Sequence, residues 1–296
     1  MPRVAVVTDT THYLPREMVE RYELRQVSLY VNWNGRTDRE QDLPDFDEYY
    51  DHLRSATELP TTSQPSVGDF LSVYEPLVRD GRDIVSIHLS GGISGTVRAA
   101  EQARDELLGQ GVAPGRILVY DTRTVAAGTG VVAIAAANAA RRGADAQAVV
   151  EAANALRADL KVWFAVETME FLKRGGRVGA ARAWLGSTLK IKPILSIETE
   201  VVPVERVRTS GRAFERMVEY LALRHESGHD AWFVQHIQAH GQAERLVERG
   251  REIFGSEPEF VSEIGPVIGT HAGPGLLGVS AIRRELLEAR AASGVI

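Results

Sequence analysis

The sequence contains no cysteine among its 296 residues, and this absence excludes three kinds of chemistry. A chain without cysteine forms no disulfide bond, holds no zinc ion through thiolates and has no cysteine nucleophile. The absence fits a reducing compartment, and we predict a cytoplasmic location.

Long apolar runs are also absent. The most apolar stretch is VVAIAAANAA (131–140), which is too short to span a bilayer and contains Asn138. The first ten residues, MPRVAVVTDT, have no long apolar segment, so no signal peptide is predicted. The alanines of 131–140 predict a tightly packed, buried helix instead.

An excess of basic charge is the third absence. The formal net charge is −6, and no basic stripe is visible along the chain, which argues against a nucleic-acid-binding protein. The hydrophobic content of 44% and the charged content of 25% are ordinary for a soluble globular protein. At roughly 150 residues per domain, the length predicts two domains.

In the first half of the chain, strand-like and helix-like segments alternate. The expected strands are 3–9, 24–33, 83–90 and 116–122, and the expected helices are 14–22, 45–53, 66–78, 96–108 and an alanine-rich stretch that ends near 141. Ser66 is the expected N-cap of its helix, Asp45 and Glu48 have capping-box spacing, and Asn34-Gly35 indicates a turn. This alternation predicts a mostly parallel sheet flanked by helices, with ligands near the carboxyl ends of its strands.

The second half begins near residue 160 and has a different order of elements. A helix over 145–160 leads to a strand over 161–167, and 194–207 is predicted as two strands joined at 198–200. Helices over 211–226 and 243–254 flank a strand over 231–237. We therefore predict an α/β protein with an N-terminal domain (1–160) and a C-terminal domain with a mixed sheet (161–296). The helix-like tail 283–296 packs in the second domain or back against the first.

Two loops of the predicted N-terminal domain are rich in hydroxyls or glycine. PTTSQPS (60–66) precedes a predicted helix, so its hydroxyls and the free N–H groups of the helix form either an anion cradle or an ordinary turn with a cap. SGGISGT (90–96) joins a strand to a helix and matches neither a P-loop nor the GxSxG nucleophile elbow. It is either a close-approach loop for a ligand or a plain connection.

The second half adds basic and imidazole groups. In EFLKRGGRVG (170–179), the cations either complement a helix dipole or contact a phosphate or a partner protein. HIQAH (236–240) has the spacing of a helical zinc pair, but it lacks the glutamate of HExxH and begins on a predicted strand, so we predict no metal site. We interpret His12, His52, His225 and His229 as surface or loop residues. His271 differs because glycine and proline surround it in GPVIGTHAGPGLLG (265–278).

Taken in order, the motifs TTSQPS, SGGISGT, FLKRGGRV, KPIL and GPVIGTHAGPGLLG resemble those of the DegV family of fatty-acid-binding proteins, from VVTDTT to about residue 282. The opening DTTHYLP (9–15) departs from the family's usual DSTSDLP-like pattern. The resemblance implies two α/β domains with a long-chain fatty acid in a deep tunnel between them. It also implies a bacterial carrier that presents the acid to a separate fatty acid kinase and takes the acyl phosphate toward phospholipid synthesis.

The same resemblance assigns ligand-binding roles residue by residue. Thr62 and Ser94 match hydroxyls that hold the ligand carboxylate, and His271 matches the family's histidine at the head-group end. Either Arg174 or Arg177 of the basic segment faces the ligand. The remaining candidates are neighbours of the two hydroxyls: Ser63, Gly95 and Thr96. No cofactor, metal or catalytic residue is predicted, and the partners expected are the fatty acid, the kinase and transient contact with a membrane, with the protein itself a monomer.

Energetics favour a binding protein over an enzyme. Burying an acyl chain contributes about 0.8 kcal/mol per methylene, whereas a hydrogen bond to a charged group contributes about 1.5–3 kcal/mol. The chain therefore dominates affinity, and the head-group residues set orientation. Two alternatives remain open. One is a hydrolase or phosphotransferase that uses Ser94 and His271, and the other is a scaffold whose ligand is only structural.

Overall fold

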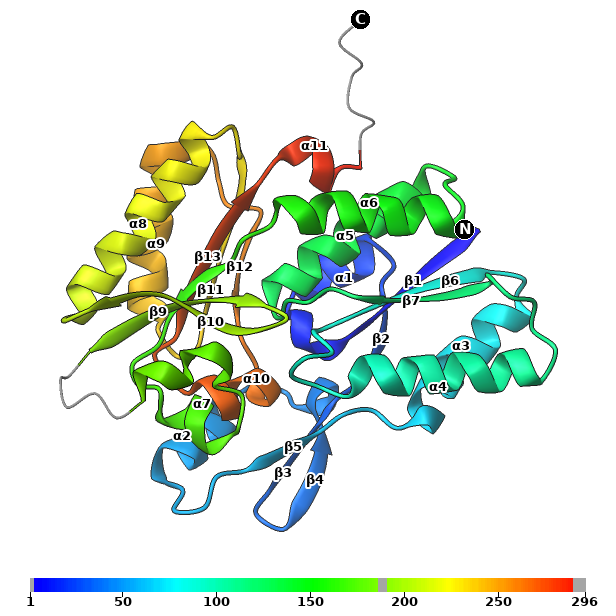
Figure 1. Cartoon of the computed structure of the whole chain (residues 1–296), viewed down its shortest axis with the longest axis horizontal. Coiled ribbons are helices and arrows are strands. Elements are labelled where there is room, and N and C mark those ends of the chain that lie inside the picture. Colours follow the sequence, from blue (N-terminus) through cyan, green and yellow to red (C-terminus); the bar gives the residue numbers. More distant parts are fainter. Residues whose placement is uncertain (1–2, 186–190, 290–296) are drawn as a thin grey trace, which may run out of the picture. The chain divides into compact units, whose positions relative to one another are not determined.

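The computed structural model describes residues 3–185 and 191–289, which form two compact units (Figure 1). Unit 1 contains residues 3–29, 64–160 and 283–289, and unit 2 contains the described residues of Tyr30–Ser63 and Lys161–Ile282. The units are therefore not contiguous in sequence. They differ from the predicted domains in that residues 30–63 belong with the second half of the chain. The described part of the tail, 283–289, belongs with the first, which is one of the two placements expected for it.

Unit 1 is built on a parallel sheet. Its strands, in the spatial order β2-β1-β6-β7, are Arg25–Val27, Val4–Asp9, Asp83–His88 and Ile117–Asp121. Figure 1 shows α3 (Val67–Arg79) and α4 (Thr96–Gly109) on one face, and α5 (Ala127–Arg141) and α6 (Ala146–Asp159) on the other. Because helices cover both faces, β1 reads as an unbroken buried run rather than an alternating one.

The helices of unit 1 follow their sequence signals closely. Ser66 caps α3 in a capping box with Asp69, and this confirms the predicted cap. Almost every residue of α5 is buried, which confirms the packed alanine-rich helix. Its small side chains allow close neighbours: a Cβ on Gly130 would collide with Leu14. The remaining short elements are η1 (Thr10–His12), α1 (Arg16–Arg21) and α11 (Arg284–Leu287).

Unit 2 is built on a mixed sheet of six strands. In the spatial order β10-β9-β8-β13-β11-β12 they are Glu200–Val207, Lys192–Glu198, Trp163–Ala165, Leu277–Ile282, Ala231–His236 and Phe260–Glu263. Only β11 and β12 pair in parallel within this sheet. The helices α8 (Ser210–Glu226) and α9 (His240–Phe254) pack their apolar sides on it. Both the parallel sheet and the mixed sheet match the predicted fold class.

A smaller antiparallel sheet also belongs to unit 2. It has the order β4-β3-β5, with β3 at Tyr30–Trp33, β4 at Arg36–Arg39 and β5 at Thr61–Ser63. Asn34 and Gly35 both have positive φ, 49° and 73°, as a type I′ hairpin turn requires, so the predicted turn is confirmed. The segment η2 (Glu40–Asp42) and the helix α2 (Asp47–Ser55) lie between β4 and β5.

Two local expectations were wrong in this region. The single strand predicted over 24–33 is two strands in two sheets, because β2 pairs with β1 while β3 pairs with β4 and β5. Asp45 does not cap α2 through a capping box; its carboxylate accepts from the backbone N–H of Asp47. The hydroxyls of 61–63, for which an anion cradle and an ordinary turn were both open, lie on β5.

The last short helices of unit 2 are α7 (Glu170–Arg174), η3 (Gly179–Trp184) and α10 (Pro266–Ala272). Across residues 3–185 and 191–289, no helix combines the length and the apolar character needed to cross a membrane.

Candidate functional site

His271 lies in the last turn of α10. Pro266 is the first residue of this helix, where its missing N–H costs nothing. Gly273 ends the helix with φ at 79°, a conformation that a residue with a Cβ adopts only under strain. Glycine and proline thus set where the helix starts and stops, and this places His271 at its C-terminal end.

Three side chains from the segment 40–50 hold α10 in place. The backbone N–H of Val267 donates to the buried carboxylate of Glu40 at 2.8 Å, at the positive end of the helix dipole. The hydroxyl of Thr270 donates its one proton to the carbonyl of Pro266. It therefore accepts a hydrogen bond from the Tyr49 hydroxyl, at 2.5 Å. Tyr50 donates to the carbonyl of Ile264 at 2.5 Å. Burial raises the pKa of Tyr49 to about 12, so this phenol keeps the proton it donates at neutral pH.

The side chain of His271 contacts Thr62. Nε2 of His271 lies 2.9 Å from Oγ1 of Thr62. Side chains alternate along β5, so Thr61 and Ser63 face the opposite side, where both accept hydrogen bonds from the amide of Asn32. Ser63, a predicted ligand residue, therefore points away from His271.

The other ring nitrogen of His271 faces backbone. Nδ1 is buried and has no hydrogen-bond partner in the described part of the chain, and a Cβ on Gly175 would collide with it. Burial, and then the positive charge of Arg177, lower the pKa of His271 from 6.5 to about 4. The imidazole is therefore neutral at physiological pH.

The two candidate arginines differ in their contacts. Arg177 donates to the carbonyl of Gly175 at 2.7 Å and acts on the pKa of His271. Arg174 donates to the carbonyl of Thr57 at 3.2 Å. Of the two, Arg177 is the arginine associated with the His271 side chain.

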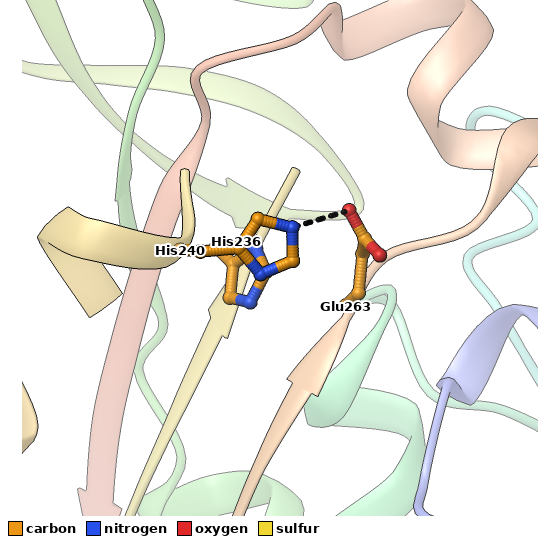
Figure 2. Close-up of side chains that lie close together, drawn as sticks. All are labelled: His236, His240 and Glu263. Atoms are coloured by element: carbon orange, nitrogen blue, oxygen red, sulfur yellow. Dashed lines mark ion pairs between the residues drawn. The ribbon is translucent and has the colours of Figure 1, made fainter. Parts of the chain in front are cut away.

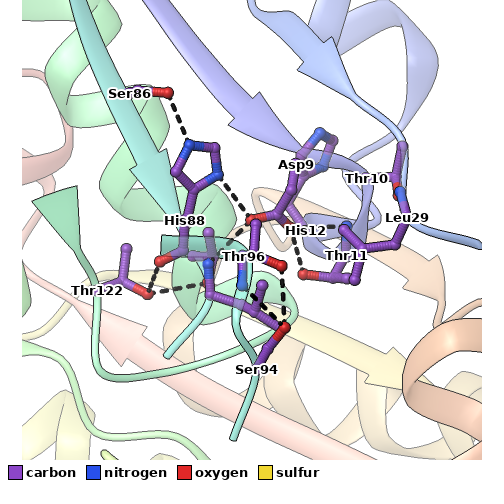
Figure 3. A network of polar contacts seen from close by, with 12 residues as sticks. Asp9, Thr10, Thr11, His12, Leu29, Ser86, His88, Ser94, Thr96 and Thr122 are labelled. Atoms are coloured by element: carbon purple, nitrogen blue, oxygen red, sulfur yellow. Dashed lines mark hydrogen bonds and ion pairs between the residues drawn. The ribbon is translucent and has the colours of Figure 1, made fainter. Parts of the chain in front are cut away.

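Ser94, Gly95 and Thr96 lie together in unit 1, where α4 begins. Oγ of Ser94 lies 2.9 Å from Oγ1 of Thr96, and Figure 3 shows the two hydroxyls side by side. Gly95 is the N-cap residue of α4, and a Cβ there would collide with the side-chain amide of Gln64. Ser94 and His271 belong to different units, and the Ser94 hydroxyl has no histidine partner among the described residues.

A fully buried polar network, which sequence reasoning missed, lies at the carboxyl ends of β1 and β6 (Figure 3). The Tyr74 hydroxyl donates to Ser86 at 2.6 Å, Ser86 contacts Nε2 of His88 at 2.7 Å, and Nδ1 of His88 contacts Asp9 at 3.0 Å. Burial alone would raise the pKa of Asp9, but its hydrogen bond and charge interaction with His88, together with bonds from Thr11 and Leu89, outweigh burial and lower it.

This network has the connectivity of a serine–histidine–aspartate triad but not its accessibility. Ser86, His88 and Asp9 are all 0% exposed, and Tyr74 covers the hydroxyl that a substrate would have to reach. A nucleophile must contact its substrate, so the buried Ser86 hydroxyl is not placed for nucleophilic catalysis. The network instead links β1 to β6 through His88 and Asp9.

Two of the histidines expected on the surface or in loops are buried. His12 is 1% exposed, and its Nδ1 accepts from the backbone N–H of Leu14 at 2.8 Å. Burial lowers the pKa of His12 to about 4, against a smaller opposing effect of Asp9. His229 is 8% exposed and contacts the carbonyl of Arg224. Both imidazoles bond to backbone within a few residues, so they support local structure.

Comparison with known proteins finds similarity over nearly the whole chain. The profile of the family described as "Uncharacterised protein, DegV family" matches residues 3–284. Protein DegV of Bacillus subtilis is 34% identical over 279 residues, which cover 93% of this chain and 98% of that protein. A DegV domain-containing protein of Streptomyces coelicolor is 38% identical over 279 residues, covering 93% of this chain and 97% of that protein.

Solved structures agree with the sequence comparison. A DegV family protein from Thermus thermophilus, whose structure is described as one of fatty acid binding, is 34% identical with a TM-score of 0.83, over 96% of this chain and 100% of that one. DegV from Bacillus subtilis, described as a fatty acid binding protein, is 33% identical with a TM-score of 0.84, over 94% of this chain and 98% of that one.

Proposed function

The chain belongs to the DegV family, and on this premise we propose that it binds a long-chain fatty acid and presents the carboxylate to a separate fatty acid kinase. In this proposal the protein is a cytoplasmic, monomeric carrier that takes the acid, and then the acyl phosphate, between the kinase and lipid synthesis with transient membrane contact. Fatty acid binding is the activity named for similar proteins from Thermus thermophilus and Bacillus subtilis.

The observation that carries the proposal is the contact between Thr62 and His271. A buried Nδ1–H without an acceptor is costlier than an unpaired lone pair, so the ring proton belongs on Nε2. Nε2–H then donates to Oγ1 of Thr62, and the hydroxyl proton of Thr62 is free to donate to a second acceptor. The carboxylate of a fatty acid is such an acceptor.

In this arrangement Thr62 contacts the head group, and His271 acts as a positioning residue. The buried Nδ1 cannot reach a ligand, because its surface is covered and Gly175 lies against it. Arg177 adds positive charge near the ring, which favours an anion nearby. Ser94 remains a predicted second donor, whose test is separate because it lies in the other unit.

The hydrolase alternative gains no observation in its favour. A serine nucleophile needs a base within hydrogen-bond reach, at about 2.6–3.2 Å. Within the described residues the Ser94 hydroxyl pairs with Thr96, and Nε2 of His271 is engaged by Thr62.

Lipid extraction of the purified full chain tests ligand binding. We expect mass spectrometry to find one long-chain fatty acid per chain, and delipidated protein to bind added fatty acid in a calorimetric titration. Protein that carries no lipid and binds none when it is added would contradict the proposal.

Delivery is tested separately, by adding a fatty acid kinase and ATP to the loaded protein. We expect acyl phosphate to form only when both proteins are present. Acyl phosphate formation or ester hydrolysis by this chain alone would instead favour an enzyme.

A further inference from the structure

Three side chains with metal-ligating atoms meet at one edge of the mixed sheet in unit 2. His236 is the last residue of β11, Glu263 is the last residue of β12, and His240 is the first residue of α9. The parallel register places His236 directly beside Glu263. One ligand atom from each residue lies within 4.8 Å of the other two (Figure 2).

The sequence interpretation placed the start of HIQAH on a strand, and the structure confirms this. In HIQAH the pair does not lie on one helix, because β11 ends at His236 and α9 begins at His240. The turn between them nevertheless brings the rings to a centroid distance of 4.6 Å. The third group, Glu263, comes from a neighbouring strand and has no counterpart in the HExxH pattern.

We propose that His236, His240 and Glu263 form a binding site for a divalent transition-metal ion, with Zn²⁺ as the representative ligand. Two imidazoles and one carboxylate are a recognised zinc set. In tetrahedral coordination, with zinc–nitrogen bonds of about 2.0–2.1 Å, ligand atoms lie about 3.3 Å apart. Nε2 of His240 is already 3.9 Å from Oε1 of Glu263, so small side-chain rotations close the site.

Two of the three side chains are held in place by their surroundings, so only the third must move to bind an ion. Oε1 of Glu263 accepts from the backbone N–H of Gln238 at 3.1 Å and from its side-chain amide at 2.9 Å, so the carboxylate is held in place. His236 is 6% exposed and is also fixed. The His240 side chain is 62% exposed, and it can rotate onto an ion at the edge of the sheet.

A set of three protein ligands leaves a coordination position open. Zinc sites with three protein ligands keep the fourth for water or another small molecule, whereas structural sites fill all four. Because His240 is exposed, the fourth position of this site faces solvent. The hydrogen bonds of Gln238 to Glu263 are the outer contacts that orient a metal-ligating carboxylate.

A Zn²⁺ titration against a chromophoric chelator tests the proposal on the full-length, tag-free chain. We expect one competing Zn²⁺ per chain. His240→Ala and Glu263→Gln should each weaken binding by at least about tenfold, since even the loss of an outer contact costs about 10- to 100-fold. Glu263→Gln keeps an oxygen that can accept from Gln238, so the fold is preserved. Bound Co²⁺ should give the intense visible absorption of a four-coordinate site in the unmodified chain and not in the two cluster variants.

His225→Ala is the matched control, because His225 is an exposed histidine of the same unit outside the cluster. This substitution should leave the affinity for Zn²⁺ and the number of Zn²⁺ ions bound per chain unchanged. The proposal is overturned if the unmodified chain binds no stoichiometric Zn²⁺, or if both cluster variants bind as tightly as the control. Equal weakening in His225→Ala would also overturn it. No lipid enters this measurement, so its outcome is independent of the fatty-acid proposal.

Discussion

Thr62 offers the sharpest test of the head-group site at the scale of single residues. Thr62→Ala removes the one hydroxyl that His271 orients, so fatty-acid binding should weaken by about 1.5–3 kcal/mol, the value of a hydrogen bond to a charged group. Thr61→Ala is the control, because Thr61 lies on the other side of β5 against Asn32. Calorimetric titration measures both variants, and equal affinities would exclude Thr62 as the donor.

His271→Ala should separate binding from delivery. The acyl chain supplies most of the affinity, so the variant should bind fatty acid nearly as well as the unmodified protein. Phosphorylation by the kinase should fall by about a hundredfold, because a misplacement of about 1 Å at the reacting group has that effect. Melting temperature, affinity and acyl phosphate formation are measured on the same variant. Normal phosphorylation with lowered stability would make His271 purely structural.

His12 predicts how stability depends on pH. Above pH 6.5 this imidazole is neutral in both the folded and the unfolded chain. Below pH 6.5 the unfolded chain takes up a proton, whereas the folded chain does so only near pH 4, so the free energy of unfolding falls over this interval. One proton corresponds to a slope of about 1.4 kcal/mol per pH unit.

The variant His12→Asn checks this slope. An asparagine oxygen can replace Nδ1 as the acceptor for the N–H of Leu14, so the fold is kept while the titrating group is removed. Urea unfolding between pH 5 and pH 6 should show a shallower pH dependence in this variant than in the unmodified chain. His225→Asn, which removes an exposed imidazole, is the comparison, and identical slopes in all three proteins would contradict the assignment.

At the scale of elements, α10 depends on the absence of a side chain at Gly269. A Cβ there would collide with the ring and hydroxyl of Tyr50, both of which are buried. Gly269→Ala should therefore lower the free energy of unfolding by about 1–3 kcal/mol, as overpacking does. Gly211→Ala in α8 has open space around its Cβ and should be neutral or stabilising by up to about 1 kcal/mol. Chemical denaturation compares the two variants, and equal free energies of unfolding would show that the Tyr50 side chain moves aside at no cost.

Elements with strong local signals could be predicted from the sequence, and elements defined by distant partners could not. The cap at Ser66 and the buried helix α5 depend on residues close in sequence, and both were found. The stretch 24–33 has uniform strand character, yet it divides because its halves pair with different strands. Only the partners distinguish β2 from β3, and these lie elsewhere in the chain.

The same distinction applies to the candidate sites. Thr62 and His271 were assigned together because each lies in a recognisable motif, although 209 positions separate them. His88 and Glu263 lie in ordinary strand sequence. The role of His88 depends on its contact with Asp9, and that of Glu263 on its position near His240. A single titratable residue at the end of a strand gives no sign of which neighbour it will meet.

At the scale of the whole molecule, the chain passes between the two units four times, after residues 29, 63, 160 and 282. A fragment of residues 1–160 therefore contains 30–63 without the rest of unit 2. Tyr49 and Tyr50 would lose Thr270 and Ile264 as partners, so we expect 30–63 to be cut rapidly by protease in the fragment and protected in the full chain. Mass spectrometry of a limited digest identifies the cut sites, and equal protection would mean that this segment folds independently.

The anchoring of α10 by residues 40–50 also has a consequence during synthesis. Glu40, Tyr49 and Tyr50 leave the ribosome long before Val267, Thr270 and Ile264, their hydrogen-bond partners. At about 5–20 residues per second, the delay is roughly ten to forty seconds. Throughout that interval two large aromatic side chains of the nascent chain lack their native partners. This segment therefore stays without its native packing until nearly the whole chain has been synthesised.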